Sequence, residues 1–434
     1  MGVKRLGLTP LESDMTVAEH QFTGRGTLTE TFGLGTDPVP LEPYKSKDFF
    51  ELEKETIFGR AWLYVCREEE IPAPGSFIVK DILPFGISAL ITHTKAGRIQ
   101  AFYNSCPHRG SIVVKAPEGN ASRFSCPYHR WTFSNEGDLL GVPDKENFFP
   151  TLQKEDCGLA KIATSTWDGF VFINFSKEPE VSLEEFLGPV KDHLAGMYYP
   201  GASNPVVYTA VLDANWKVAQ DAFIESYHIP HIHKNTIGTT FASKLNPYSR
   251  LIGAKPLGAH RTISLFGNAD YVVDPNNRVE ALGTVGEKAG STMTASTGED
   301  VERYRNHAAI NPDASEHWSM DIHQLFPNFH IDTGPGSFWT HQFWPLTEST
   351  CFYEVRFYVN EATTIRERLM QELFIARVGE VVLEDLENLQ WTQKGVETSG
   401  KAVMHLQDSE VAIRHSMSQI VKWTKSATVK EALA

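Results

Sequence analysis

The chain has 434 residues, of which 41% are hydrophobic and 22% are charged, so it can bury a sizeable core and is not disordered. Its 40 basic and 54 acidic residues give a formal net charge of −14, which disfavours nucleic acids and anionic membranes as partners. No apolar run reaches the roughly 18 residues of a membrane span, so we expect none. Five cysteines in such a length indicate the reducing cytoplasm rather than a disulfide scaffold.

The first half of the chain is predicted to hold one small β unit. Residues 1–40 are rich in Gly, Thr and Pro and resemble an arm, whereas apolar residues at helical spacing predict a helix over 45–64. From residue 71 to about residue 175, short apolar runs alternate with turn residues, which is typical of an all-β unit. The clearest strand candidates in it are residues 77–82, 85–92, 99–104 and 169–175.

The second half mixes helices and strands. A helix is predicted over 215–227, ended by Pro230, and the Gly/Ser/Thr-rich residues 281–300 predict a loop that could serve as a lid. Residues 364–392 contain no proline and predict one long helix, with a core face of Leu369, Leu373, Ala376, Val382, Leu383 and Leu386. Other predicted elements are a helix at 182–197 and strands at 205–212, 323–333, 337–346 and 350–359. The predicted class is therefore α+β.

Two short motifs pair a cysteine with a histidine. Cys106-x-His108 and Cys126-x-x-His129 are separated by seventeen residues, and each lies in a predicted loop between strands. Three interpretations compete: buried cysteines with unrelated histidines, a Cys₂His₂ zinc site, and a Rieske [2Fe–2S] cluster. Zinc fingers usually pair Cys with Cys and His with His, so the mixture within each motif favours the Rieske cluster. The cysteines without a partner motif are predicted to be ordinary buried residues: Cys66, Cys157 and Cys351.

A second group of candidate metal ligands follows. His228 and His233 are separated by four residues, and Glu225 precedes His228 by three, so that on a helix these two would share a face. If Pro230 breaks that helix, His233 can turn back toward His228. Two histidines and one carboxylate form the facial triad of non-haem Fe(II) sites, which leaves positions open for O₂. His231 is a rival ligand within the same run.

The carboxylate of such a triad has to come from another part of the chain. The predicted C-terminal helix contains the acidic run VVLEDLENLQW, in which Glu384 and Asp385 are the candidates. Either residue alone would be interpreted as a solvated helix charge. The two motifs upstream favour Asp385 as the third ligand.

Three segments together carry a resemblance to a known family. CPH–x₁₇–CPYHRWTF, NWKVAQDAFIESYHIPHIH and EDLEN resemble the catalytic α subunit of Rieske non-haem iron oxygenases, the aromatic-ring-hydroxylating dioxygenase family. The resemblance covers about residues 40–400, in the family's order. It implies an arm and the start of the catalytic part over 1–45, an all-β Rieske [2Fe–2S] domain over 46–175, and a helix-grip catalytic domain, an antiparallel sheet with a long helix, over 176–434.

The resemblance also implies roles for particular residues. The residues that match cluster ligands are Cys106, His108, Cys126 and His129, and those that match ligands of a mononuclear Fe(II) are His228, His233 and Asp385. Glu225 takes the place of the carboxylate that bridges a cluster histidine and the first iron histidine; alternatively it only orients His228 or pairs with a cation such as Lys217. The family forms head-to-tail trimers in which the cluster of one subunit faces the iron of the next. Members with small β subunits usually have Asp at the position of Glu225. With Glu there, the chain is more similar to trimeric members that act without a β subunit.

The implied activity uses O₂, a small-molecule substrate and electrons from a separate ferredoxin or flavin reductase, because the chain has no G-x-G-x-x-G motif after a strand. We expect hydroxylation of an aromatic or other hydrophobic small molecule. The alternative is oxidative N- or O-dealkylation of an amine, quaternary ammonium or ether substrate. A Rieske electron carrier would leave His228 and His233 without a role. Four aromatic residues either line a substrate pocket or belong to the β core: Phe338, Trp339, Phe343 and Trp344.

Overall fold

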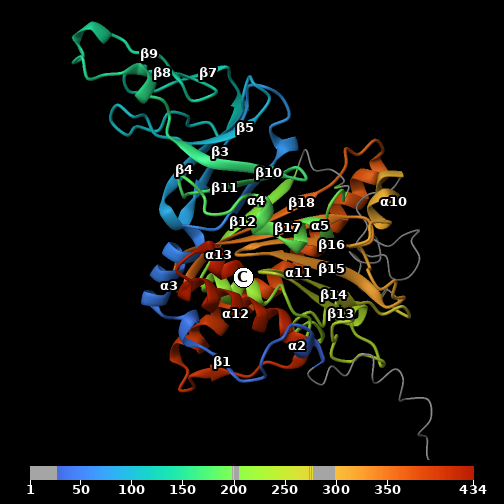
Figure 1. Cartoon of the computed structure of the whole chain (residues 1–434). Coiled ribbons are helices and arrows are strands. Elements are labelled where there is room, and N and C mark those ends of the chain that lie inside the picture. Colours follow the sequence, from blue (N-terminus) through green and yellow to red (C-terminus); the bar gives the residue numbers. More distant parts are fainter. Residues whose placement is uncertain (1–26, 198, 200–204, 273, 275, 277–298) are drawn as a thin grey trace, which may run out of the picture.

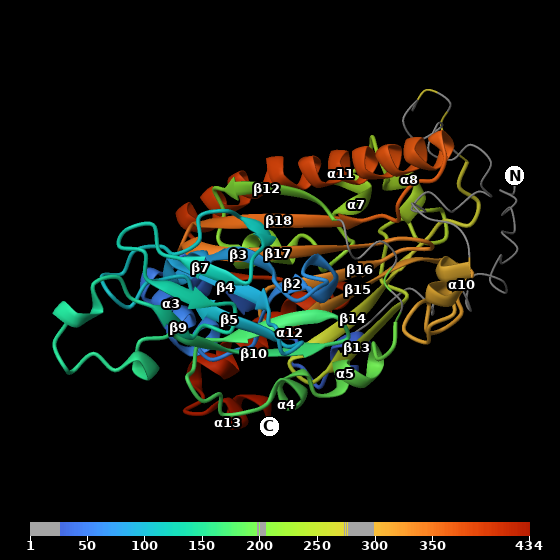
Figure 2. The ribbon, with the colours of Figure 1, turned by 90° about the horizontal axis from the view of Figure 1, so that it is seen from above.

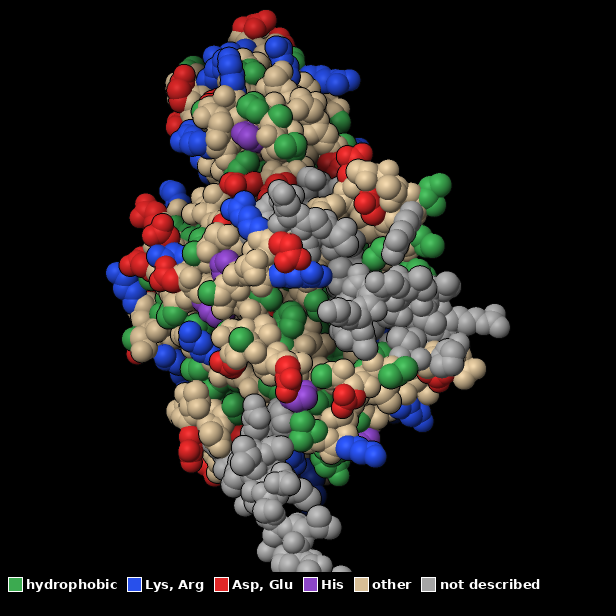
Figure 3. Space-filling view, turned by 90° about the vertical axis from the view of Figure 1, so that its right-hand side faces the viewer, with side chains coloured by type: hydrophobic (Ala, Val, Ile, Leu, Met, Phe, Trp, Pro, Cys, Tyr) green, Lys and Arg blue, Asp and Glu red, His purple; other side chains and the backbone are tan. Residues whose placement is uncertain are grey.

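The structure is a computed structural model that describes residues 27–434 except 198, 200–204, 273, 275 and 277–298. Two large sheets form two lobes, and the predicted α+β class is confirmed (Figure 1). The predicted loop at 281–300 lies outside the described residues up to position 298. Figure 3 shows the first lobe above the second, with acidic and basic side chains interspersed over the visible face. In the described part of the chain, no helix has the length and apolar character needed to cross a membrane.

The first lobe contains a seven-stranded antiparallel sheet and a three-stranded sheet at its far end (Figure 1). In spatial order the large sheet runs β2 (Leu63–Arg67), β11 (Phe170–Asn174), β10 (Lys161–Trp167), β5 (Ile99–Tyr103), β4 (Ile87–His93), β3 (Ser76–Ile82) and β6 (Glu118–Asn120). The small sheet consists of β7 (Arg123–Ser125), β8 (Thr132–Ser134) and β9 (Leu139–Gly141). The four predicted strands correspond to β3, β4, β5 and β11, with one or two residues of difference at their ends. A separate apolar cluster beneath the small sheet includes Cys106 and Cys126, so both thiols lie in a core of their own.

The second lobe is a seven-stranded antiparallel sheet with one long helix that runs beside β12 (Val206–Leu212) and β18 (Thr350–Tyr358) (Figure 2). Its strands run β12, β18, β17 (Phe338–Thr347), β16 (Phe329–Thr333), β15 (Trp318–Leu325), β14 (His260–Phe266) and β13 (Gly253–Leu257). The long helix is α11 (Ile365–Thr398), which begins at a capping box formed by Thr364 and Glu367. Three short helices that lie near the candidate metal ligands are α6 (Trp216–Asp221), α7 (Ile229–Ile232) and α8 (Gly238–Phe241).

The remaining helices cover the outside of the two lobes. They are α2 (Thr27–Thr31), α3 (Lys47–Glu53), α4 (Leu183–Leu187), α5 (Pro189–His193), α10 (Glu299–Arg305), α12 (Val411–Lys425) and α13 (Val429–Leu433). The arm joins the C-terminal part, because β1 (Val39–Pro40) pairs with β19 (Val403–Met404). The predicted helix at 182–197 is divided into α4 and α5 at Gly188, whose φ of +48° is readily adopted only by glycine. The predicted helix at 45–64 ends earlier, in a π-helical turn over Lys54–Phe58, because the next residues enter β2.

Two other sequence predictions are wrong in an informative way. Residues 323–333 are not one strand, because Phe326–Asn328 form the turn between β15 and β16; Pro327 has no N–H to continue a ladder. The predicted helix at 215–227 ends at Asp221. Beyond it, the Glu225 carboxylate accepts the backbone N–H groups of Tyr227 and His228, which replaces helical hydrogen bonds with a local turn.

The predicted core face of α11 is also wrong. Of its six residues only Val382 is buried, while Leu369 and Leu383 are 55% and 66% exposed. The buried stripe does recur at helical spacing, but four of its positions are polar. Its members are Gln371, Phe374, Ile375, Arg377, Val378, Val382, Asp385, Leu389 and Gln393. Hydrophobicity alone therefore assigns the wrong face, since this helix presents functional groups to the interior.

A fully buried ion pair fixes α6 against α3. The Lys217 Nζ lies 2.8 Å from Glu53 Oε2, which also accepts the Trp216 indole N–H at 3.1 Å, and both charged residues are 1% exposed. Burial raises the pKa of Glu53 and lowers the pKa of Lys217. Each charge therefore depends on the other for compensation.

Replacing Glu53 with alanine is expected to lower the free energy of unfolding by about 3–5 kcal/mol, because Lys217 would be left buried and unpaired. Urea unfolding followed by far-UV circular dichroism measures this loss. The matched control is Glu51→Ala, which removes the partner of Lys54 from an ion pair with a 56% exposed carboxylate and should change little. Equal stability of the two variants would contradict this account of the pair.

Candidate metal centres and substrate pocket

The two Cys/His motifs form loops of the same backbone design, over residues 106–111 and 126–131. In each loop the cysteine N–H donates to the carbonyl five residues later, and the N–H four residues later donates back to the cysteine carbonyl, at 2.8–3.0 Å. The residue that closes each turn, Gly110 or Arg130, is left-handed, with φ of +75° or +58°. Both loops are therefore tight turns that hold the cysteine inside and the following residues outside.

The environment of the two sulfur atoms suits thiolate ligands. Cys106 and Cys126 are buried, and no disulfide links any of the five cysteines. Burial opposes ionisation, but backbone N–H groups of Tyr128 and His129 donate to the sulfur of Cys126 and hold its pKa below the ordinary value. The sulfur of Cys106 accepts the equivalent N–H groups of its own loop, although burial and the neighbouring sulfur of Cys126 keep its pKa above the ordinary value. Thiolate ligands with such donors are those that iron–sulfur clusters require.

The two imidazoles lie beside each other above the sulfur atoms. The ring centroids of His108 and His129 are 4.7 Å apart; His108 stacks on buried Trp131, and His129 stacks on exposed Tyr128. A tetrahedral zinc site would bring all its ligand atoms to within about 4 Å of one another. Within the described residues, one group of three or more candidate ligands has all its ligand atoms close enough to share a single metal ion, and it lies in the second lobe. The Cys/His set therefore fits a two-iron cluster better than one zinc ion.

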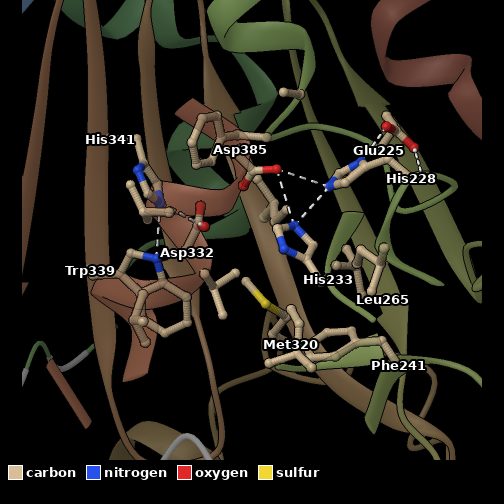
Figure 4. A pocket seen from close by; sticks show the side chains of 18 of the residues that line it. Glu225, His228, His233, Phe241, Leu265, Met320, Asp332, Trp339, His341 and Asp385 are labelled. Atoms are coloured by element: carbon tan, nitrogen blue, oxygen red, sulfur yellow. Dashed lines mark hydrogen bonds and ion pairs between the residues drawn. The ribbon is translucent and has the colours of Figure 1, made fainter. Parts of the chain in front are cut away.

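That second group is made of His228, His233 and Asp385 (Figure 4). The Nε2 atoms of the two histidines are 3.2 Å apart, and Asp385 Oδ1 lies 3.4 Å from the first and 3.1 Å from the second. The histidines flank the single turn of α7, while Asp385 comes from α11. The prediction that Pro230 breaks a helix is wrong. Pro230 stands in the first turn of α7, where its fixed φ favours helix initiation.

Outer carboxylates orient both imidazoles. Glu225 makes a close hydrogen bond with Nδ1 of His228, and Glu384 Oε2 lies 2.7 Å from Nδ1 of His233 and accepts the Thr236 hydroxyl at 2.6 Å. Each Nδ1 therefore faces a carboxylate acceptor, which lets a neutral imidazole keep its proton there and offer Nε2 to a metal ion. Two imidazole nitrogens and one carboxylate oxygen this close together form a set that a single cation would hold. Two imidazoles and one carboxylate are the donor set of non-haem Fe(II).

The charge around His228 favours a cation at this position. Burial lowers its basicity, but Glu225 and then Asp385 outweigh burial and raise the pKa of His228 to about 9. The rival His231 is exposed, and its ring lies against Tyr227, outside this group. Lys217 cannot serve as the cation for Glu225, because its ammonium group pairs with Glu53. The two neighbouring carboxylates of α11 therefore have different positions. Asp385 lies among the candidate metal ligands, at Nε2 of His233, whereas Glu384 lies behind the same imidazole, at Nδ1.

A pocket opens on the three candidate ligands and has one apolar and one polar wall (Figure 4). Its empty space is about 610 Å³, counting the part open to solvent. The apolar wall includes Phe223, Ile229, Ile237, Phe241, Leu265, Met320, Ile322 and Val378, and the polar wall includes Asp332, Trp339, His341 and Arg377. Of the four aromatic candidates only Trp339 lines the pocket. Alternation along β17 turns Phe338 and Trp344 to the opposite face of the sheet, whereas Phe343 shares the face of Trp339 but packs against Phe223 and Tyr353. Neither Asp332 nor His341 was predicted to line a pocket. Alternation along β17 would have placed His341 on the face of Trp339, but Asp332 comes from the neighbouring strand β16.

Two family models match this chain. The Rieske [2Fe-2S] domain matches residues 61–161, and the ring hydroxylating alpha subunit (catalytic domain) matches residues 198–426, which is more than half of the chain. The chain belongs to the ring-hydroxylating α-subunit family. The predicted cofactors, a [2Fe–2S] cluster and a mononuclear iron, are thereby confirmed, and the His/His/Asp group fits the latter. The predicted domain boundaries at 46–175 and 176–434 stay predictions.

Curated relatives include dioxygenase and demethylase subunits. The chain is 35% identical over 190 residues to the 2-aminobenzenesulfonate 2,3-dioxygenase subunit alpha of Alcaligenes sp (43% of this chain, 47% of the relative). It is 31% identical over 224 residues to the N,N-dimethyl phenylurea N-demethylase subunit alpha of Sphingobium sp. strain YBL2 (49% and 47%). The matches span about half the length of these curated relatives.

Solved structures of the family share the fold along most of the chain. Naphthalene 1,2-dioxygenase from Rhodococcus sp. has a TM-score of 0.71 at 20% identity, over 93% of this chain and 98% of that chain. The quaternary ammonium Rieske monooxygenase CntA has a TM-score of 0.67 at 20% identity, over 88% and 94%. A ring-hydroxylating α-subunit fold is thus common to enzymes with different substrates, so the substrate of this chain has to be inferred from its own pocket.

Proposed function

We propose that this chain is the oxygenase component of a Rieske system that uses O₂ and electrons from a separate ferredoxin or flavin reductase to hydroxylate an aromatic or other hydrophobic small molecule. The observation that carries the proposal is the convergence of His228 Nε2, His233 Nε2 and Asp385 Oδ1 within 3.1–3.4 Å at the end of a largely apolar pocket. Oxidative dealkylation of an amine, quaternary ammonium or ether is the alternative, and the cytoplasm is the proposed location.

We assign the cluster to Cys106, His108, Cys126 and His129, and the mononuclear iron to His228, His233 and Asp385. When bound, this iron supplies the centre at which O₂ is reduced. The chain itself contributes orientation: Glu225 and Glu384 hold the Nδ1 protons of the two imidazoles, so that both Nε2 atoms point into the pocket. The apolar wall excludes water and holds the hydrophobic body of the substrate.

We further propose that electrons pass between subunits of a homotrimer. In one chain, the small sheet that carries the Cys/His loops projects away from α7 and α11, which supports delivery to a neighbouring copy (Figures 1 and 2). Glu225 is 10% exposed at its side chain and His228 19%, so a neighbour can approach this end of the group. A structurally similar quaternary ammonium Rieske monooxygenase (TM-score 0.65, 21% identity) is reported to use inter-subunit electron transfer.

Oxygen uptake with product identification tests the proposed function. The protein, loaded with iron and reduced by a ferredoxin and its flavin reductase, is offered naphthalene, biphenyl, 2-aminobenzenesulfonate or N,N-dimethyl phenylurea. We expect uptake that requires both the reductase and one of these compounds, with oxygen from ¹⁸O₂ in the product or, for dealkylation, loss of an alkyl group. Reductase-independent uptake without any oxidised product would contradict the proposal.

Replacing Glu384 with alanine is expected to weaken iron binding by about 10–100-fold, because the imidazole of His233 loses the acceptor that orients it. Iron release to a chelator, followed by equilibrium dialysis, measures the change. The matched control is Glu387→Ala, which removes an exposed carboxylate one turn further along α11 and should leave iron binding unchanged. Equal affinities of the two variants would mean that Glu384 does not support the metal site.

A further inference from the structure

Asp332 places an unusual charge in the wall of the substrate pocket. It lies on β16, is 3% exposed, and lines the pocket together with Trp339 and His341 of β17 (Figure 4). Its carboxylate is separate from the group of three candidate metal ligands. Carboxylates this deeply buried are normally paired or hydrogen-bonded, because an uncompensated charge is costly away from water.

The hydrogen bonds around Asp332 leave its carboxylate without a full set of donors. The indole N–H of Trp339 donates to Nε2 of His341 at 3.0 Å, and Nδ1 of His341 lies 2.7 Å from the Tyr353 hydroxyl. Nε2 of His341 also lies 3.3 Å from Asp332 Oδ2, so His341 and Trp339 together serve one side of this carboxylate. The other oxygen, Oδ1, is buried and has no hydrogen-bond partner among the described residues.

The groups around Asp332 leave this oxygen without a donor. Burial raises the pKa of Asp332, and His341 and the hydrogen bond from Trp339 act against burial, but Oδ1 itself has no partner among the described residues. Asp332 Oδ1 is a hydrogen-bond acceptor without a donor, in a pocket whose other wall is apolar. Such a pocket favours a ligand that carries its own hydrogen-bond donor.

We propose that Asp332 binds an N–H group of the substrate, so that the substrate class is an apolar molecule carrying a protonated amine or another N–H donor. The nitrogen lies at Asp332 Oδ1, and the hydrophobic body lies along the wall formed by residues such as Phe241, Leu265 and Met320. An unsubstituted hydrocarbon would leave the carboxylate unpaired and would bind more weakly. This inference deepens the proposed function and rests on it.

A competing explanation is that Asp332 only supports His341 within the sheet. That role requires the carboxylate for stability and predicts no preference among ligands. The two explanations therefore differ in a binding measurement made with a pair of probes that share their ring and differ only in the donor. Benzylamine, which is protonated at neutral pH, and benzyl alcohol form such a pair.

The experiment is calorimetric titration of the iron-loaded, cluster-containing protein with benzylamine and with benzyl alcohol, under argon. We expect the wild-type chain to bind benzylamine at least about tenfold more tightly than benzyl alcohol, since a charge-assisted hydrogen bond adds about 1.4 kcal/mol or more. Asp332→Asn, which keeps the size but removes the charge, should abolish the preference. The control Asp81→Asn changes an exposed carboxylate of β3 and should keep it.

The outcomes separate this inference from the proposed function. Iron and cluster contents, measured on the same samples, report on the proposed function alone. Wild-type protein with both metals but without the tenfold preference would overturn the inference, and so would a folded Asp332→Asn variant that retains it. If Asp332→Asn does not fold, Asp332→Ser takes its place. Loss of the preference for benzylamine in that variant would support the inference, and its retention would overturn it.

Discussion

Replacing Asp385 with alanine is expected to lower the iron content from about three to about two atoms per chain and to abolish turnover, while the visible spectrum of the cluster stays unchanged. Asp385 provides the only carboxylate oxygen of the three-ligand group, at 3.1 Å and 3.4 Å from the two Nε2 atoms. The cluster loops lie in the other lobe and have their own core, so the two losses should separate. Iron analysis and cluster absorbance on the same sample measure both.

The control for this variant is Glu387→Ala on the exposed side of the same helix, which should keep all three iron atoms. Normal iron content and activity in Asp385→Ala would assign the carboxylate ligand to Glu384 instead. Simultaneous loss of iron and cluster from a folded protein would contradict the division of the two metal centres between the lobes.

Replacing Glu225 with glutamine is expected to slow electron transfer from the cluster to the iron by orders of magnitude, while both metal contents stay near wild type. A carboxylate can accept hydrogen bonds from two imidazole N–H groups at once. Glu225 contacts Nδ1 of His228, and in the proposed trimer its second partner would be a cluster histidine of a neighbouring copy. An amide has one acceptor oxygen and an NH₂ donor, so it cannot replace both contacts. Single-turnover experiments with pre-reduced protein, substrate and O₂ follow cluster re-oxidation directly.

Glu384→Gln is a matched control for this test, because Glu384 contacts Nδ1 of His233 in the way that Glu225 contacts Nδ1 of His228. If Glu225 only orients its imidazole, both variants should change iron affinity to a similar extent and leave the transfer rate alone. Re-oxidation at the wild-type rate in Glu225→Gln would contradict the bridging role.

Local motifs explain why most of the candidate site could be predicted from the sequence. Cys106 and His108, or His228 and His233, are separated by few residues, so their spacing already constrains how they can meet. The predicted partnership with Asp385 rested on the two upstream motifs and on the family resemblance rather than on spacing, because about 150 residues separate it from the histidines and only the packing of α11 brings it near. The adjacent residue on the helix, Glu384, contacts the other nitrogen of His233, so a shift of one helical position separates a metal ligand from a residue that orients the ligand.

The features that could not be predicted depend on which way a side chain faces. In α11 the apolar residues Leu369 and Leu383 are exposed, because the buried stripe is shared with polar groups that serve the interior. Asp332 has no motif around it, and its importance follows only from the pairing of β16 with β17, which places it opposite Trp339. Hydrophobic periodicity predicts neither the buried face of α11 nor the position of Asp332, because in both cases polar residues face the interior instead of the solvent.

Mössbauer spectroscopy of the wild-type protein, prepared with iron-57 and reduced under argon, tests the central claim most directly. The account predicts two kinds of iron in a ratio of about two to one: the pair of a Rieske cluster with unequal ligands, and one high-spin ferrous ion at His228, His233 and Asp385. A spectrum that contains only cluster iron, or a protein that carries zinc at the Cys/His loops, would contradict it.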